Sequence, residues 1–125
     1  MAESITAQMD KILGEFIEGV QDKTNKTTKA TAQETVKQLK ATSPKRPGGG
    51  RYAKGWAVKD ESAGQLSSFR VYNRTDYQLT HLLENGHIIR NKKGTYGRTA
   101  PIKHIEPAAD EGAVTLERKL REAIE

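Results

Sequence analysis

Apolar residues recur every three or four positions along the first forty residues. Charged residues fill the other faces, as in an amphipathic helix whose apolar stripe is Ile5, Met9, Ile12, Leu13, Phe16, Ile17 and Val20. The pattern thins over residues 24–29, resumes at Ala32, Val36 and Leu39, and stops at Ser43-Pro44. Because residues 24–29 contain no glycine or proline, we expect one continuous or gently bent helix, roughly 55 Å long at 1.5 Å per residue. A break near residues 24–28 would instead give an ordinary helix pair.

The middle of the chain alternates with the period of two that is typical of strands. Residues 54–60 place Trp56 and Val58 on one face, and residues 66–72 have the pattern of an antiparallel partner after a turn at 61–65. Trp56 is the only tryptophan, and we expect it to anchor the core rather than to stack on a ligand.

A strand, a short helix and a second strand are expected between residues 71 and 91. Asn73 opens a turn, and Thr75 or Asp76 can accept hydrogen bonds from the first amides of a helix of about two turns. The spacing puts three leucines of this helix on one side: Leu79, Leu82 and Leu83.

The end of this short helix is marked by Asn85-Gly86. Glycine adopts the left-handed backbone that closes a helix, so we expect a positive φ at Gly86 and a return to extended chain from His87. Leu82 and Leu83 are accordingly expected in or near the core.

The remaining residues predict a loop and a last helix. Residues 91–101 form a glycine-rich basic loop, residues 102–105 a short strand or approach segment, and Pro107 suits a first helical position. The apolar stripe of the last helix is Ala109, Ala113, Leu116, Leu120 and Ile124. This helix is expected to cover the sheet.

These elements predict an α+β fold in a single domain, 1–125. It comprises a long helix (1–42), a flexible basic loop (43–53), an antiparallel sheet of three to four strands with a short inserted helix (54–105), and a C-terminal helix packed on the sheet (106–125).

The order and spacing of several of these residues resemble the head-to-tail joining family of long-tailed bacteriophages, which are neck or tail-completion proteins. The resemblance rests on Gly55-Trp56-Ala57-Val58, Val71-Tyr72-Asn73, Tyr77, Leu82-Leu83-Glu84-Asn85-Gly86-His87 and His104-Ile105-Glu106-Pro107-Ala108. It implies structural roles for Tyr72, Asn73 and residues 82–86.

The resemblance also implies a function. It suggests a virion protein between the portal-side connector and the tail, assembled in the host bacterial cytoplasm as a ring around the DNA channel. The implied partners are copies of itself, neighbouring connector and tail proteins, and nearby phage DNA. Catalysis, cofactors, metals and membranes are not part of this expectation.

The composition fits a protein whose fold is completed by neighbouring proteins. Only 34% of the 125 residues are apolar and 30% are charged, which leaves little for an interior. The absence of cysteine excludes disulfides and thiolate metal sites. With neither an apolar segment of membrane-spanning length nor a leader pattern, the chain is expected to be soluble and unexported.

The net charge of +5 is concentrated in two regions. Residues 43–60 and residues 77–105 each carry five basic residues and one acid, whereas residues 106–125 carry three basic residues and six acids. The candidate subunit or DNA-channel contacts are Lys45, Arg46, Arg51, Lys54, Arg90, Lys92, Lys93 and Arg98. They could meet nucleic-acid phosphates, an acidic face of a neighbouring subunit such as Glu117, Glu122 and Glu125, or solvent alone. Because the two basic loops, residues 45–54 and 90–103, contain almost no aromatic residues apart from Tyr52 and Tyr96, we favour a protein partner.

Catalytic readings have less support. The triple glycine at 48–50 lacks the Gly-Lys-Ser/Thr ending of a phosphate-binding loop. Three histidines, His81, His87 and His104, are not at metal-ligand spacing. One alternative is a small basic nucleic-acid-binding module or a toxin-type endoribonuclease, with His87, His104, Tyr96 and Arg98 around a scissile phosphate.

Overall fold

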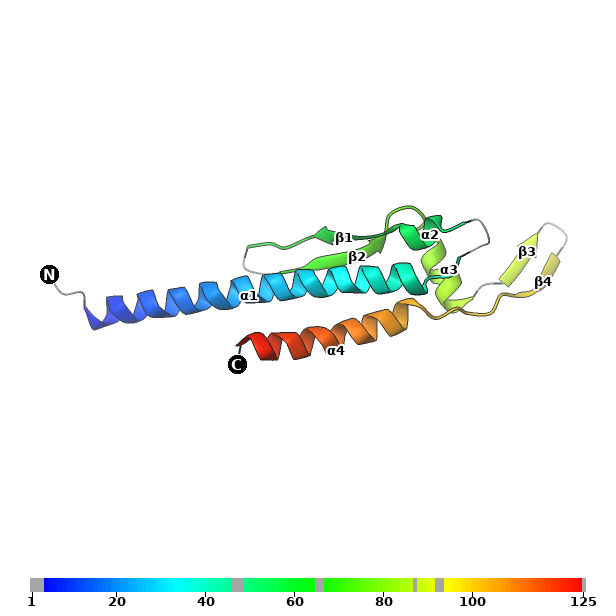
Figure 1. The fold of residues 1–125 in the computed structure, drawn as a ribbon. Coiled ribbons are helices and arrows are strands. Elements are labelled where there is room, and N and C mark those ends of the chain that lie inside the picture. Colours follow the sequence, from blue (N-terminus) through cyan, green and yellow to red (C-terminus); the bar gives the residue numbers. More distant parts are fainter. Residues whose placement is uncertain (1–3, 46–48, 65–66, 87, 92–93, 125) are drawn as a thin grey trace.

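The computed structural model describes residues 4–45, 49–64, 67–86, 88–91 and 94–124. Its elements, in chain order, are α1 (Ile5–Thr42), α2 (Arg51–Lys54), β1 (Trp56–Asp60), β2 (Phe69–Asn73), α3 (Leu79–Asn85), β3 (Ile88–Asn91), β4 (Gly94–Arg98) and α4 (Ile105–Ile124). Helix α1 runs along most of the molecule (Figure 1).

The continuous first helix is confirmed, and several of its threonines bond to the helix's own backbone. The hydroxyls of Thr28, Thr31 and Thr35 donate to the carbonyl oxygens four residues earlier, at 2.7 to 2.9 Å. They satisfy their own hydrogen-bonding needs within the helix instead of competing for its amides. At the start, Ser4 Oγ accepts from the Ala7 amide at 3.1 Å as a cap. The 38 residues of α1 therefore rise about 57 Å.

The second half of α1 lies between two other layers. The β1–β2 hairpin packs on one side and α4 on the other (Figure 1). The hairpin is antiparallel, with Trp56 opposite Asn73 and Asp60 opposite Phe69. The α+β class is confirmed, but α4 covers α1 rather than the sheet. The close contact is made by small residues, since a side chain at Gly112 would meet Thr35.

The predicted sheet is divided. Within the described residues, β1 pairs only with β2, and β3 pairs only with β4 in a separate antiparallel hairpin. Residues 94–98, predicted as part of a loop, form strand β4 of this second hairpin. Gly94 and Gly97 adopt positive φ angles in this strand, a backbone conformation that glycine allows without the strain a side chain would add.

The core is small and lies at the end of the molecule where α1 finishes. Its buried members are Val36, Leu39, Tyr52, Trp56 and Ala108, with Val58, Val71, Leu83 and Ile105 packed partly buried against them. The predicted core position of Trp56, which is only 5% exposed, is confirmed.

The two leucines of α3 that were expected in or near the core differ in burial. Leu83 packs against the core, whereas Leu82 is 41% exposed, so the prediction that both are core or near-core is wrong for Leu82. Helix α3 has only seven residues and approaches the core along one edge. Leu79 and Leu82 line an open cleft beside Leu83, which confirms that the three leucines share a side.

Asn73 is buried and organises the turn after β2, as predicted. Its Nδ2 donates to the Tyr52 carbonyl at 2.7 Å, and its Oδ1 accepts from the amides of Thr75 and Asp76 at 3.2 and 2.8 Å. Because Asn73 already binds these amides, the helix begins later, at Leu79, without a side-chain cap. The expected capping by Thr75 or Asp76 is therefore wrong. Tyr72 is half-buried and pairs with Ala57 across the hairpin.

Gly86 has the expected positive φ, at 73°. A Cβ at this position would collide with the carbonyl oxygen of Thr99 and approach Pro101 N at 3.2 Å. We predict that Gly86→Val destabilises the protein by ~1 kcal/mol or more, since a β-branched residue is strained in left-handed backbone. Urea unfolding measures the change.

The matched control for this prediction is Gly14→Val. Gly14 lies in α1, where a Cβ would meet nothing within 4 Å, and valine has the higher helix propensity. Equal unfolding midpoints for the two variants would contradict the role assigned to Gly86.

Candidate functional site

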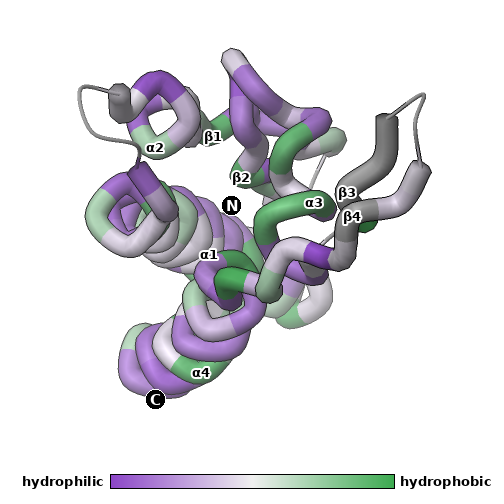
Figure 2. The backbone as a smooth tube through the Cα atoms, turned by 90° about the vertical axis from the view of Figure 1, so that its right-hand side faces the viewer, coloured by the Kyte–Doolittle hydropathy of each residue, from purple (hydrophilic) through white to green (hydrophobic). Residues whose placement is uncertain are grey.

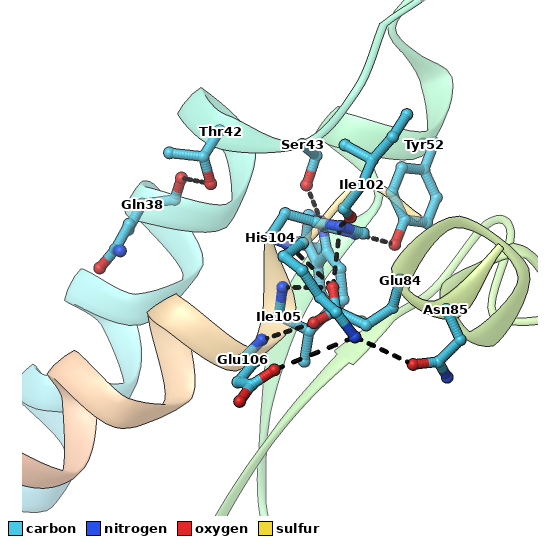
Figure 3. A network of polar contacts seen from close by, with 12 residues as sticks. Gln38, Thr42, Ser43, Tyr52, Glu84, Asn85, Ile102, His104, Ile105 and Glu106 are labelled. Carbon is cyan, nitrogen blue, oxygen red and sulfur yellow. Dashed lines mark hydrogen bonds and ion pairs between the residues drawn. The ribbon is translucent and has the colours of Figure 1, made fainter. Parts of the chain in front are cut away.

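The first turn of α4 is held by a carboxylate from α3. Glu84 Oε1 accepts hydrogen bonds from the amides of His104 at 2.9 Å and Ile105 at 2.8 Å, and Oε2 accepts from Glu106 at 2.9 Å (Figure 3). The next residue, Pro107, has no N–H. Glu84 therefore satisfies the backbone donors that a helix start leaves unpaired, and it places negative charge at the positive helix end.

His104 connects this helix start to α2 and is fully buried. Its Nδ1 lies 2.8 Å from the Ile102 carbonyl, which can only accept, so Nδ1 carries the hydrogen. In a neutral imidazole, Nε2 then accepts from the Tyr52 hydroxyl, which lies 2.7 Å away. Both ring nitrogens are thus occupied within the protein (Figure 3).

Tyr52 and Trp56 extend the junction to α1. The ring of Tyr52 meets those of Trp56 and His104 edge to face, with centroids 5.7 and 5.6 Å apart. Trp56 Nε1 donates to Ser43 Oγ at 2.7 Å, directly after the last residue of α1. Residues of α2, β1 and α3 therefore meet the end of α1 and the start of α4 in one buried polar cluster, which we call the junction: Ser43, Tyr52, Trp56, Glu84 and His104.

Two pKa shifts show how the junction is charged. Burial acts to raise the pKa of Glu84, but the three backbone amides and the His104 ring outweigh it, so the pKa is held below the usual 4.5. Burial, with the nearby Glu84 charge, raises the pKa of Tyr52 to about 12. At neutral pH the carboxylate is thus an acceptor and the phenol a donor, as the hydrogen bonds require.

This geometry argues against the nuclease alternative. His104 is enclosed and fully hydrogen bonded, so it cannot reach a phosphate. His87 and the side chain of Tyr96 lie outside the described part of the chain, and Arg98 donates to the carbonyl of Asn85 at 3.1 Å.

The described residues contain neither a candidate metal site nor a candidate membrane-spanning helix. Across the described ranges, no three His, Cys, Asp or Glu side chains come together in a way that could hold a metal ion. The same part of the chain contains no helix with the length and apolar character needed to cross a bilayer.

The first half of α1 carries an exposed apolar surface. It extends beyond the hairpin and α4 (Figure 1), and its six large apolar side chains are between 50% and 76% exposed. We call this surface the α1 stripe: Ile5, Met9, Ile12, Leu13, Phe16 and Ile17. Single exposed apolar residues are ordinary, but a contiguous row of six on one helix face marks an interaction site.

A second apolar surface lies near the opposite end of the molecule. Here a cleft of about 630 Å³ opens between the end of α1, α2 and α3. Its apolar lining is Leu79, Leu82, Leu83, Ile102 and Tyr52, and its polar lining includes Lys45, Arg51 and Asp76. Viewed toward this end, α3 is the most hydrophobic of the labelled helices (Figure 2).

Those predicted basic contacts that lie within the described residues are near this same end of the molecule. Lys45 and Lys54 are exposed. Arg51 is also exposed, but it forms an ion pair with Asp76 at 3.3 Å and donates to the Thr75 carbonyl at 3.3 Å. Arg98 lies on β4.

Four further predicted contacts fall wholly or partly outside the described residues. Arg46, Lys92 and Lys93 lie outside the described residues, and so does the side chain of Arg90. On the acidic side, Glu117 pairs with Arg121 at 2.7 Å within α4. The last helix therefore neutralises part of its own charge.

Sequence reasoning did not identify the junction. Pro107 indicated a helix start, which implies preceding amides that need an acceptor, but the acceptor lies twenty residues upstream. Glu84 was noticed only as a charge and as part of the resemblance, and Ser43 only as a helix stop. The available signal was a carboxylate directly after two leucines and just before an Asn-Gly turn.

We predict that Glu84→Gln destabilises the protein by about 2 kcal/mol at pH 7, because an amide offers one carbonyl oxygen and turns a donor toward the α4 amides. Urea unfolding measures the loss. Glu122→Gln, at an exposed position of α4, is the control and should leave stability nearly unchanged.

The same variant carries a pH prediction. Because the folded pKa of Glu84 lies below its unfolded value, its stabilisation is complete above about 4.5 and is lost as pH falls through the lower folded value. The difference between wild type and Glu84→Gln should therefore shrink below pH 4.5. A difference that stays constant from pH 7 to pH 3 would contradict the charged cap.

The chain was also compared with known proteins. No curated protein and no solved structure matches it. A family model described as "Bacteriophage HK97-gp10, putative tail-component" matches residues 3–86, two thirds of the chain. The matched range includes the α1 stripe, Trp56, Asn73 and Glu84. The chain therefore belongs to the HK97-gp10-like family of bacteriophage tail components.

Proposed function

We propose that the protein is a structural component of the phage head–tail connector. In this role it joins the capsid-side connector to the tail, as a ring of copies around the DNA channel. The family supports a structural role in the phage tail. Assembly would take place in the host cytoplasm and leave the protein in the virion, with no catalytic step or cofactor.

The observation that carries this proposal is the α1 stripe. Six large apolar side chains are exposed to solvent on the half of α1 that no other described element of the same chain covers. The core is small and lies at the other end, so nothing in the fold requires the helix to continue this far. A projecting apolar half-helix is well suited to bind a neighbouring subunit.

The distribution of surfaces supports contacts that are not self-complementary. The first half of α1, which carries the stripe, and helices α2 and α3, which border the basic cleft, lie toward opposite ends of the molecule (Figure 1). When one surface of each copy binds a different surface of the next, repetition gives a ring if the rotation closes. The basic residues near the cleft, Lys45, Arg51, Lys54 and Arg98, are our candidates for contacts with subunits or channel DNA.

We predict that phage carrying Ile12→Asp with Phe16→Asp accumulate separate heads and tails. Both side chains are exposed, so the substitutions should leave the fold intact while preventing burial of the α1 stripe. Electron microscopy of lysates counts joined particles, and a several-fold loss is expected.

The control is the double substitution Lys11→Asp with Gly14→Asp, which adds two aspartates to the remaining surface of the same helix half. It should permit normal joining. Joined particles in normal numbers from the stripe variant would contradict the proposal.

We also predict that the purified protein does not cleave RNA above background, and that His104→Ala lowers stability by leaving the Tyr52 hydroxyl unpaired. Gel assays and thermal unfolding measure these effects. RNA cleavage that His104→Ala abolishes in a folded sample would favour the endoribonuclease.

A further inference from the structure

The α1 stripe has the spacing of a helix that binds in a groove. Counted from Met9, its members stand at i, i+3, i+4, i+7 and i+8: Met9, Ile12, Leu13, Phe16 and Ile17. An amphipathic helix placed in an apolar groove uses this set of positions. The partner surface that receives the α1 stripe should therefore be concave and apolar.

The cleft beside α3 has these properties. Its volume of about 630 Å³ is in the range of well-formed binding clefts, and Leu79, Leu82 and Ile102 are each about 40% exposed along it. Their apolar surface is not used by the core. An apolar helix face would remove it from water.

The charges of the two surfaces are opposite. Residues 4–22 of α1 carry Asp10, Glu15, Glu18 and Asp22 against Lys11, a net charge of −3. The cleft end exposes Lys45, Lys54 and Arg98. Asp76, the acidic residue in the cleft lining, is already paired with Arg51.

Charge also decides against the simplest alternative. Two α1 stripes packed on each other would bring two surfaces of net −3 together, which is unfavourable at low and moderate salt. Placing the stripe in the basic cleft brings opposite charges together instead.

The two surfaces cannot meet within one chain. They lie toward opposite ends of a helix that rises about 57 Å and is continuous over its 38 residues. From these observations we infer that the α1 stripe of one copy docks into the α3 cleft of a second copy, as the repeating contact of the assembly. The inference rests on the proposed function in needing copies that bind one another, and it names the acidic partner as α1 rather than α4.

Cysteine cross-linking tests the contact, because the chain has no cysteine of its own. The purified full-length double variant Phe16→Cys/Leu82→Cys is oxidised at high protein concentration and low salt. Docking of stripe into cleft gives a ladder of disulfide-linked multimers on a non-reducing gel. Mixing the two single variants gives linked dimers and no ladder.

The control is Gly14→Cys/Leu82→Cys. Gly14 is exposed and two residues from Phe16, which places it about 160° around the helix. Only background cross-linking is expected, and raising the salt to 1 M should weaken the ladder of the test variant several-fold. Circular dichroism verifies that all variants fold.

Two results would overturn the inference. Linked dimers from Phe16→Cys alone, equal in yield to those of the mixture, would mean that α1 binds α1. Absence of a ladder from the folded double variant would mean that the cleft is not the partner. The proposed function is tested separately, by mass spectrometry of purified particles. The protein can be present in virions whichever gel result is obtained. Its absence from virions would contradict the connector role alone.

Discussion

The carboxylate of Glu84 is the interaction on which the arrangement of elements depends. Helix α4 begins after a segment without regular structure, and its first amides have no partner of their own. By accepting three of them, Glu84 fixes where α4 starts and ties it to α3. Its position brings the His104 ring into hydrogen-bonding contact with Tyr52. Tyr52 packs beside Trp56, and the indole N–H of Trp56 donates to Ser43 at the end of α1. A buried polar cluster of this kind tolerates few substitutions, because each partner lost leaves another group unsatisfied.

This constraint explains why the packed elements are concentrated at one end of the molecule. The junction, the five buried apolar side chains of the core and the short helix α3 all lie where α1 ends, while the first half of α1 has no described neighbour (Figure 1). A domain with so few apolar residues can hold one end of a 38-residue helix firmly, but not both. The exposed half is then available for contacts between molecules, and the small core is sufficient to keep the monomer folded.

Local patterns predicted the fold well where the cause was local. The periodicity of α1, the alternation around Trp56 and the turn at Asn73 each depend on neighbours within a few residues, as does the left-handed Gly86. The errors concern long-range choices. Whether α4 covers the sheet or α1 depends on small residues such as Gly112 meeting Thr35, and whether Leu82 is buried depends on how close α3 lies to other elements. The cap of α4 by Glu84 spans twenty residues, and no spacing rule connects them. Among the predicted basic contacts, position along the chain could not indicate that Arg51 is paired with Asp76.

The projecting half of α1 raises a question of helix stability, since a peptide of its length is only marginally helical in water. The costly step in helix formation is nucleation, and here the second half of α1 supplies a nucleus that packing has already formed. The first half needs only to propagate from it, one hydrogen bond for each residue added. Its free energy of local opening is therefore small and rises when the apolar face is covered. Under the proposed docking, binding of a partner and completion of the helix are coupled, because covering the apolar face would stabilise the helix along its exposed half.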